Sequence, residues 1–237
     1  MKEQYGRLDD LQRFYALLDR LEHRIGGART LSQSGGRSVW PQRGVYFFQE
    51  PGEQRQDTGK GNRIVRVGTH ALKAGSGTKI WTRLSQHKGV TKTGGGNHRG
   101  SIFRLIVGAS LIEQENLNYP TWGKGSSASR EIRKSELTLE QAVSKKIGDM
   151  PFLWLGIDDE PGPASARGYI ERNSIALLSN CCKKRLDPPS TNWLGHFCDR
   201  KLVRKSGLWN SNHVNEAYDS NFLNVLDSSI NNAGTPE

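Results

Sequence analysis

The chain of 237 residues is poor in cysteine, and this narrows its class before any motif is considered. Its three Cys are Cys181, Cys182 and Cys198, and an odd number with two adjacent argues against a secreted disulfide framework. The "CC" pair followed by "HFC" also lacks the C-x₂₋₄-C spacing of a structural zinc site, although His196 or His213 could complete one. Ordinary buried thiols are therefore favoured over zinc.

Long hydrophobic runs are absent as well. No segment reaches the roughly 18 apolar residues that a membrane span needs, and the start "MKEQYGRLDD" has no signal-peptide core. We therefore expect a cytoplasmic protein without a membrane partner. Hydrophobic residues make up 34% of the chain, and segments such as "GVYFF", "SIFRLIVGASLI" and "MPFLWLGI" can still build the core of one large domain with appendages.

Acidic residues are scarce between positions 51 and 110. This segment holds eleven Lys and Arg against two acids, which accounts for +9 of the formal net charge of +10. Such a concentration of positive charge favours a polyanionic partner, here DNA, with RNA as an alternative. The side chains expected to contact nucleic acid in this segment, including the Gly-rich loop "KTGGGNHRG", are Lys73, Lys79, Asn97, His98, Arg99 and Arg104.

Hydrophobic periodicity predicts where the helices and strands lie. Apolar residues three and four apart over 5–25 indicate an amphipathic helix that ends at "GG", and packing on the main domain is favoured over a dimer contact. Further helices are expected at about 80–88, 138–147, 166–179 and 213–228, and strands at about 44–48, 63–68, 101–111 and 150–157, with a mobile loop over 118–136. These elements predict three segments: a helix in 1–36, a central domain in 37–195 with an insertion near 118–136, and an extension in 196–237.

Two of the predicted helices carry residues suited to chemistry. Arg83 and His87 are four residues apart and so share one face of the helix at 80–88. Glu171 shares a face with Ile175 and Leu178, which directs a carboxylate toward the sheet. A carboxylate in that position needs a base, a hydrogen-bond donor or a metal as partner, and a structural salt bridge is the alternative to a functional role.

These motifs occur in an order that resembles a known family. "GVY" at 44–46, "RVG" at 66–68, "RLSQH" at 83–87 and the helix bearing Glu171 are similar to the GIY-YIG nuclease family over about 43–180. "GGNHRGSIFR" and the late extension look most like its restriction-endonuclease-like branch. Arg66 stands where the family has the Tyr of YIG. Asn180 matches the family Asn, with Asn173 and Asn192 as rivals.

The resemblance implies an α+β fold, a small central mixed or antiparallel β-sheet flanked by helices. It also implies a metal-dependent endonuclease that hydrolyses DNA phosphodiester bonds, for example in restriction or phage defence, with a homodimer as one way to cut both strands. Tyr46 would hold or deprotonate the water, helped by Arg66 or His70. Arg83 would clamp the phosphate, and His87 would orient it or shuttle a proton.

Only one carboxylate belongs to this set, which favours a single divalent ion on Glu171, Mg²⁺ or Mn²⁺, over a two-metal site. The alternative to an enzyme is a nucleic-acid-binding module whose catalytic site has decayed, as Arg66 in place of a Tyr could indicate. Cleavage of a plasmid with Mg²⁺ or Mn²⁺ separates the two interpretations.

Overall fold

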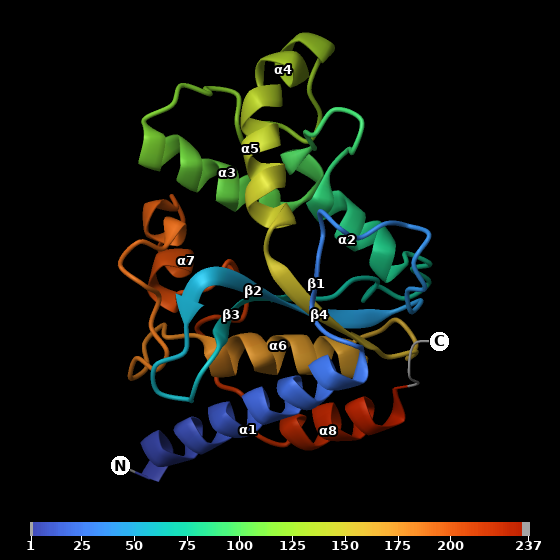
Figure 1. Cartoon of the computed structure of the whole chain (residues 1–237), viewed down its shortest axis with the longest axis vertical. Helices are drawn as coiled ribbons and strands as arrows, with labels where there is room; N and C mark the ends of the chain where they lie inside the picture. Colours follow the sequence, from blue (N-terminus) through green and yellow to red (C-terminus); the bar gives the residue numbers. More distant parts are fainter. Residues whose placement is uncertain (1, 234–237) are drawn as a thin grey trace.

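A sheet of four antiparallel strands forms the centre of the molecule (Figure 1). The computed structural model describes residues 2–233, with side chains from residue 6 onward. The strand order is β1-β4-β2-β3, with bounds β1 Arg29–Thr30, β2 Gly44–Gln54, β3 Asn62–Gly68 and β4 Pro151–Gly156. The predicted α+β class is confirmed, and within the described residues the sheet is antiparallel rather than mixed.

β2 lies between β3 and β4, so the strand that contains the apolar run "GVYFF" is hydrogen-bonded to a neighbouring strand along both of its edges. Tyr46 pairs with Gly68 of β3 and with Trp154 of β4, while Phe47 and Phe48 are fully buried on opposite faces. β-Branched and aromatic residues suit such a strand, which explains why the sequence alone locates it. The strands predicted at 44–48, 63–68 and 150–157 are confirmed, and β2 continues six residues further, to Gln54.

Helices cover both faces of the sheet. Figure 1 shows α1, α6 and α8 on one side and α2, α3 and α5 on the other, with α7 beside the outer strand β3. The bounds are α1 Lys2–Arg24, α2 Ile80–Lys88, α3 Ile102–Glu115, α4 Arg130–Ser135, α5 Leu137–Gly148, α6 Ala166–Leu178, α7 Lys201–Ser206 and α8 Phe222–Asn232, with two short 3₁₀ turns at His98–Gly100 and Leu194–Phe197.

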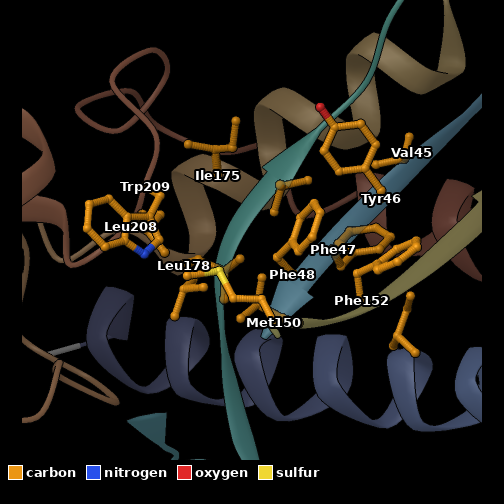
Figure 2. Packing of buried hydrophobic residues seen from close by; sticks show 14 of the residues in the cluster. Val45, Tyr46, Phe47, Phe48, Met150, Phe152, Ile175, Leu178, Leu208 and Trp209 are labelled. Carbon is orange, nitrogen blue, oxygen red and sulfur yellow. The ribbon is translucent and has the colours of Figure 1, made fainter. Parts of the chain in front are cut away.

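The N-terminal helix packs on the rest of its own chain. Its apolar stripe faces the sheet and α8, where the ring of Phe14 lies 6.0 Å from that of Phe47 and 6.3 Å from that of Phe222. Residues from all three predicted segments join one apolar cluster, part of which is drawn in Figure 2. None of the helices within residues 2–233 is long and apolar enough to span a membrane.

The strand predicted at 101–111 is wrong, because this segment forms helix α3. A short run that is apolar almost throughout fits a buried helix and a buried strand equally well. Two end signals decide for the helix: the Ser101 hydroxyl accepts the Arg104 amide as an N-cap, and Asn116 ends the helix in the left-handed region. The 118–136 segment also contains α4, and the last helix begins at Phe222, later than predicted.

Glu140 of α5 holds together the layer above the sheet. Its carboxylate accepts hydrogen bonds from the guanidinium of Arg104 and from the His98 amide, 2.6 Å away, and Arg104 in turn donates to the backbone carbonyl of His87. Burial opposes ionisation of Glu140. The hydrogen bond from His98 and the charge of Arg104 nevertheless hold the pKa of Glu140 below its ordinary value.

Glu140→Gln is expected to lower the free energy of unfolding by about 3 kcal/mol at neutral pH, because it leaves Arg104 buried without a counter-charge. Since the folded-state pKa of Glu140 is lowered, its contribution is present above the unfolded pKa and is lost as pH falls through the folded pKa. Urea unfolding at several pH values should show the two proteins converging on acidification. The same change at exposed Glu113 is the control, and equal stability of all three would contradict this role.

Candidate active site

Four side chains that the sequence predicts for the site line one cleft of about 160 Å³. Tyr46 comes from β2, Arg66 from β3, Arg83 from α2 and Glu171 from α6. The cleft therefore lies where the end of β3 meets the helices of both layers. A larger hollow of about 640 Å³ between α1 and the segments 182–186 and 217–220 contains none of the predicted catalytic side chains.

The ring of Tyr46 lies directly over Gly68. A Cβ atom on Gly68 would be 2.4 Å from the Tyr46 hydroxyl oxygen, a distance that no side chain tolerates. Similarly, a Cβ on Gly44 would be 2.3 Å from the Leu155 carbonyl oxygen. The glycines of "GVY" and "RVG" therefore let the strands and the tyrosine approach, and Figure 2 shows the Tyr46 hydroxyl pointing away from Phe47 and Phe48.

His87 connects the Tyr46 hydroxyl to the interior. Its Nε2 is 2.9 Å from the Tyr46 hydroxyl oxygen, and its Nδ1 is 2.8 Å from Oγ of Ser101, the N-cap residue of α3. Burial, together with the charges of Arg66 and nearby arginines, holds the pKa of His87 well below its usual range. The imidazole is therefore neutral at physiological pH. It is fully buried, so it contacts the tyrosine and not a group in the cleft.

Two arginines supply positive charge to the cleft. Burial lowers the pKa of Arg66, while its neighbours Tyr46 and Glu171 act in the opposite direction. The Arg66 guanidinium donates to the Trp209 carbonyl and lies 4.6 Å from the centre of the Phe103 ring. Arg83 is half-buried and is oriented by its contact with the Gly100 carbonyl, 3.2 Å away. Both guanidinium groups are thus held in place beside Tyr46 and Glu171.

Glu171 is the carboxylate of the cleft. Its Oε1 accepts the backbone amide of Thr69 at 3.1 Å, just beyond the end of β3. Burial raises the pKa of Glu171, and the charges of Arg66, His213 and Arg83 oppose that shift. Among the described residues there is no group of three His, Cys, Asp or Glu that could hold a metal by itself. One carboxylate in a polar cleft suits an ion that keeps most of its water, as Mg²⁺ does.

Comparison with known families supports the interpretation of this geometry. The sequence model of a family described as GIY-YIG domain matches residues 5–236. The chain belongs to the GIY-YIG family. Neither the curated proteins nor the solved structures give a match. Membership supports a nuclease of the endonuclease kind, with nucleic acid as substrate and, as is general for GIY-YIG nucleases, a divalent metal ion.

Other predicted catalytic residues of this GIY-YIG chain lie outside the cleft. His70 is buried, and burial together with the charge of Arg167 lowers its pKa to about 4, so it is neutral and adds no positive charge near Tyr46. Asn180, the predicted family Asn, pairs through its amide with both the amide and the carbonyl of Leu186. Its rivals differ: Asn173 binds the Tyr169 carbonyl, and Asn192 is exposed, but neither lines the cleft.

The predicted nucleic-acid contacts divide into exposed and buried groups. Lys73, Lys79 and Asn97 are exposed. His98 and Arg104 are buried against Glu140, and the guanidinium of Arg99 forms a two-pronged pair with Glu136. In the structure, therefore, His98 and Arg104 stabilise the fold and do not face solvent, because the buried carboxylate of Glu140 pairs with both of them.

Sequence reasoning missed the contribution of residues 210–213 to the cleft. Asn210, Asn212 and His213 line it together with Glu171. Asn210 pairs with the Val67 backbone, accepting its amide at 3.1 Å and donating to its carbonyl at 2.8 Å. His213 adopts a left-handed backbone with φ of 62°, and its Nδ1 is 2.8 Å from Glu216 Oε1. The only signal in the sequence was the polar cluster "NSNH" after "GLW".

Proposed function

We propose that this GIY-YIG protein is a divalent-metal-dependent endonuclease that hydrolyses phosphodiester bonds in DNA. The observation that carries the proposal is the single cleft lined by Tyr46, Arg66, Arg83 and Glu171. Phosphodiester hydrolysis needs an activated water, charge relief on the phosphoryl oxygens and help for the leaving group. The cleft contains side chains suited to the first two of these tasks. Its four predicted residues come from four separate elements, β2, β3, α2 and α6.

Tyr46 and His87 would activate the water. A neutral imidazole that donates its Nδ1 proton to Ser101 has Nε2 free to accept the Tyr46 hydroxyl proton, over the 2.9 Å that separates the two atoms. The phenolic oxygen would then take a proton from a water molecule next to the phosphorus. Because burial and the neighbouring arginines keep His87 neutral, its Nε2 lone pair stays free to accept the hydrogen bond of the Tyr46 hydroxyl across the physiological pH range.

Arg83 and Arg66 would bind the scissile phosphate. A planar guanidinium offers paired donors that match two phosphate oxygens, and both arginines are already oriented by backbone carbonyls. Their positions beside Tyr46 bring the phosphate next to the proposed nucleophile. Asn210 would take the part of the family Asn in place of Asn180, because its amide fixes the end of β3 at the cleft.

Glu171 would hold the metal, and we include Mg²⁺ in the proposal, with Mn²⁺ as a substitute. When bound, such an ion supplies Lewis-acid charge relief to the phosphoryl oxygens. The donor set supports this fit, since the Thr69 amide occupies only Oε1 of Glu171 and leaves Oε2 for the ion, and Asn212 lines the same cleft. The proposal includes a restriction or phage-defence role. It also includes a homodimer, since cutting both strands with one cleft per chain often takes two chains.

Plasmid cleavage tests the proposal. Supercoiled DNA incubated with the protein should be nicked or cut in Mg²⁺ or Mn²⁺ and stay intact in EDTA. The alternative is a decayed module that only binds nucleic acid, and it predicts a gel shift with intact plasmid under every metal condition. RNA of the same sequence, and plasmid with and without methylation, identify the preferred substrate. Intact DNA under all conditions would overturn the proposal.

A further inference from the structure

A second concentration of positive charge lies near the C-terminus, outside the segment 51–110. Residues 183–205 contain seven Lys and Arg against two Asp, a net charge of +5. We call the seven the α7 patch: Lys183, Lys184, Arg185, Arg200, Lys201, Arg204 and Lys205. Of the two acids, Asp187 is buried, where it accepts the backbone amides of residues 56–58. It therefore does little to neutralise the surface.

The charge of the α7 patch faces solvent, unlike much of the charge predicted to bind DNA. Five of its seven side chains are exposed, and none of the seven forms an ion pair with the side chains that the structure describes, those of residues 6–233. In the segment 51–110, only four of the eleven Lys and Arg are exposed. Arg63, Arg99 and Arg104 there are each paired with a glutamate. The exposed positive surface is thus richer at α7 than the sequence indicated.

The two parts of the α7 patch lie side by side. The Asn180 amide donates to the Ser206 carbonyl at 3.0 Å, which joins the segment before Lys183 to the end of α7. Lys183 and Lys205 also lie near one thiol: burial raises the pKa of Cys181, and the positive charges of Lys205 and Lys183 oppose that shift. Residues 183–185 and α7 therefore form one continuous basic surface.

A short segment connects this surface to the cleft. The Arg63 guanidinium donates to the Gly207 carbonyl at 2.6 Å, and the Trp209 amide donates to the Val65 carbonyl at 2.7 Å. The next residue, Asn210, accepts the Val67 amide through its side chain. The chain therefore runs along the outer edge of β3 from α7 into the cleft. At ~3.3 Å per residue, the strand from Arg63 to Val67 spans about 13 Å. Measured along the axis of a DNA duplex, that length corresponds to a rise of about four base pairs.

We propose that the α7 patch is a docking surface for the phosphate backbone of duplex DNA, about four base pairs along the duplex axis from the bond that is cut. This inference rests on the proposed function, since it takes the cleft as the point of cleavage. Lysine and arginine side chains without carboxylate partners release counterions when they contact phosphates, so the patch supplies affinity without sequence preference. An anionic membrane surface is the competing occupant, and the experiment below includes it.

The test compares two triple variants that remove the same charge. K201Q/R204Q/K205Q neutralises the exposed side chains of α7, and R133Q/K134Q/K145Q neutralises exposed side chains of α4 and α5. Figure 1 shows α4 at the top of the molecule, away from α7. Binding of a fluorescein-labelled duplex of about 25 base pairs is measured in EDTA, between about 50 and 300 mM KCl. Circular dichroism checks that both variants fold.

We expect the slope of log K against log[salt] to be less steep by about 2–3 in the α7 variant, because each lost phosphate contact removes about 0.9. The control should keep the wild-type slope. Equal slopes in the two variants, no binding by wild type, or loss of binding to phosphatidylserine vesicles without a change in DNA slope would each overturn the inference. Wild type that binds with this slope but never cleaves would instead contradict only the proposed function.

Discussion

Replacing Glu171 by Gln is expected to reduce the rate of DNA cleavage by about 10²–10³-fold or more while DNA affinity persists or rises. Glu171 is the only carboxylate that lines the cleft within the described residues, so its loss removes the one charged ligand of the proposed ion. Affinity arises mainly from Lys and Arg on the surface, and removing a negative charge next to a phosphate favours binding. Gln keeps an oxygen that can accept the Thr69 amide, so the end of β3 stays in place.

The measurement separates binding from cleavage. Single-turnover cleavage of a labelled duplex in Mg²⁺ gives the rate, and the gel shift of the same duplex in EDTA gives the affinity. Glu115→Gln, an exposed change on α3, is the matched control and should behave as wild type. Mn²⁺ titration by calorimetry adds a readout that does not depend on activity. A folded Glu171→Gln protein that cleaves at a rate near wild type would exclude Glu171 as the metal ligand.

The parts of the site that the sequence predicts are those with strong local patterns. Tyr46 lies in a strand that its aromatic and β-branched neighbours define, and Arg83 and His87 share one turn of a helix. Helix α6 was also predicted from its spacing and from Ser165, whose hydroxyl caps it by accepting the Gly168 amide. In each case the decisive information lies within a few residues of the side chain concerned.

The features that the sequence does not predict depend on contacts between distant segments. Asn210 reaches the cleft only through its pairing with Val67, 143 positions earlier. In the sequence, Arg104 is one of the basic residues predicted to contact DNA. In the structure its guanidinium is buried because it pairs with Glu140, which lies 36 positions later in the chain. A formal charge count does not distinguish paired arginines from exposed lysines. For this reason it assigned the basic surface to 51–110 and overlooked α7.

The position of Arg66 shows how a departure from the family motif can be accommodated. It replaces the Tyr of YIG, yet its guanidinium lies in the same cleft as Tyr46 and Glu171. A tyrosine at position 66 would need a base to accept its hydroxyl proton before it could act on water. The guanidinium of Arg66 instead places a permanent positive charge next to Tyr46 and Glu171. Under the proposed mechanism the chain would therefore rely on the one tyrosine of "GVY", and a large effect of altering Tyr46 is expected.

Tyr46→Phe is expected to reduce the cleavage rate by about 10²–10⁴-fold with little change in DNA affinity, because it removes the hydroxyl that lies between the cleft and His87. The phenyl ring keeps the packing over Gly68 and beside Phe48. Tyr15→Phe is the matched control, since it also removes a buried hydroxyl bonded to the protein, here to the Ile64 amide on β3, away from the cleft.

A double-mutant cycle decides whether Tyr46 and His87 act as one unit. If the proton of the Tyr46 hydroxyl passes to Nε2 of His87, then His87→Gln alone slows cleavage, and adding it to Tyr46→Phe produces little further loss. Two independent roles would instead multiply the two effects. Single-turnover rates at saturating protein, with thermal unfolding to confirm the fold, distinguish these outcomes. A Tyr46→Phe protein within a few-fold of wild type would require another group in the cleft to activate the water, and His213 is the titratable residue there that remains to be tested.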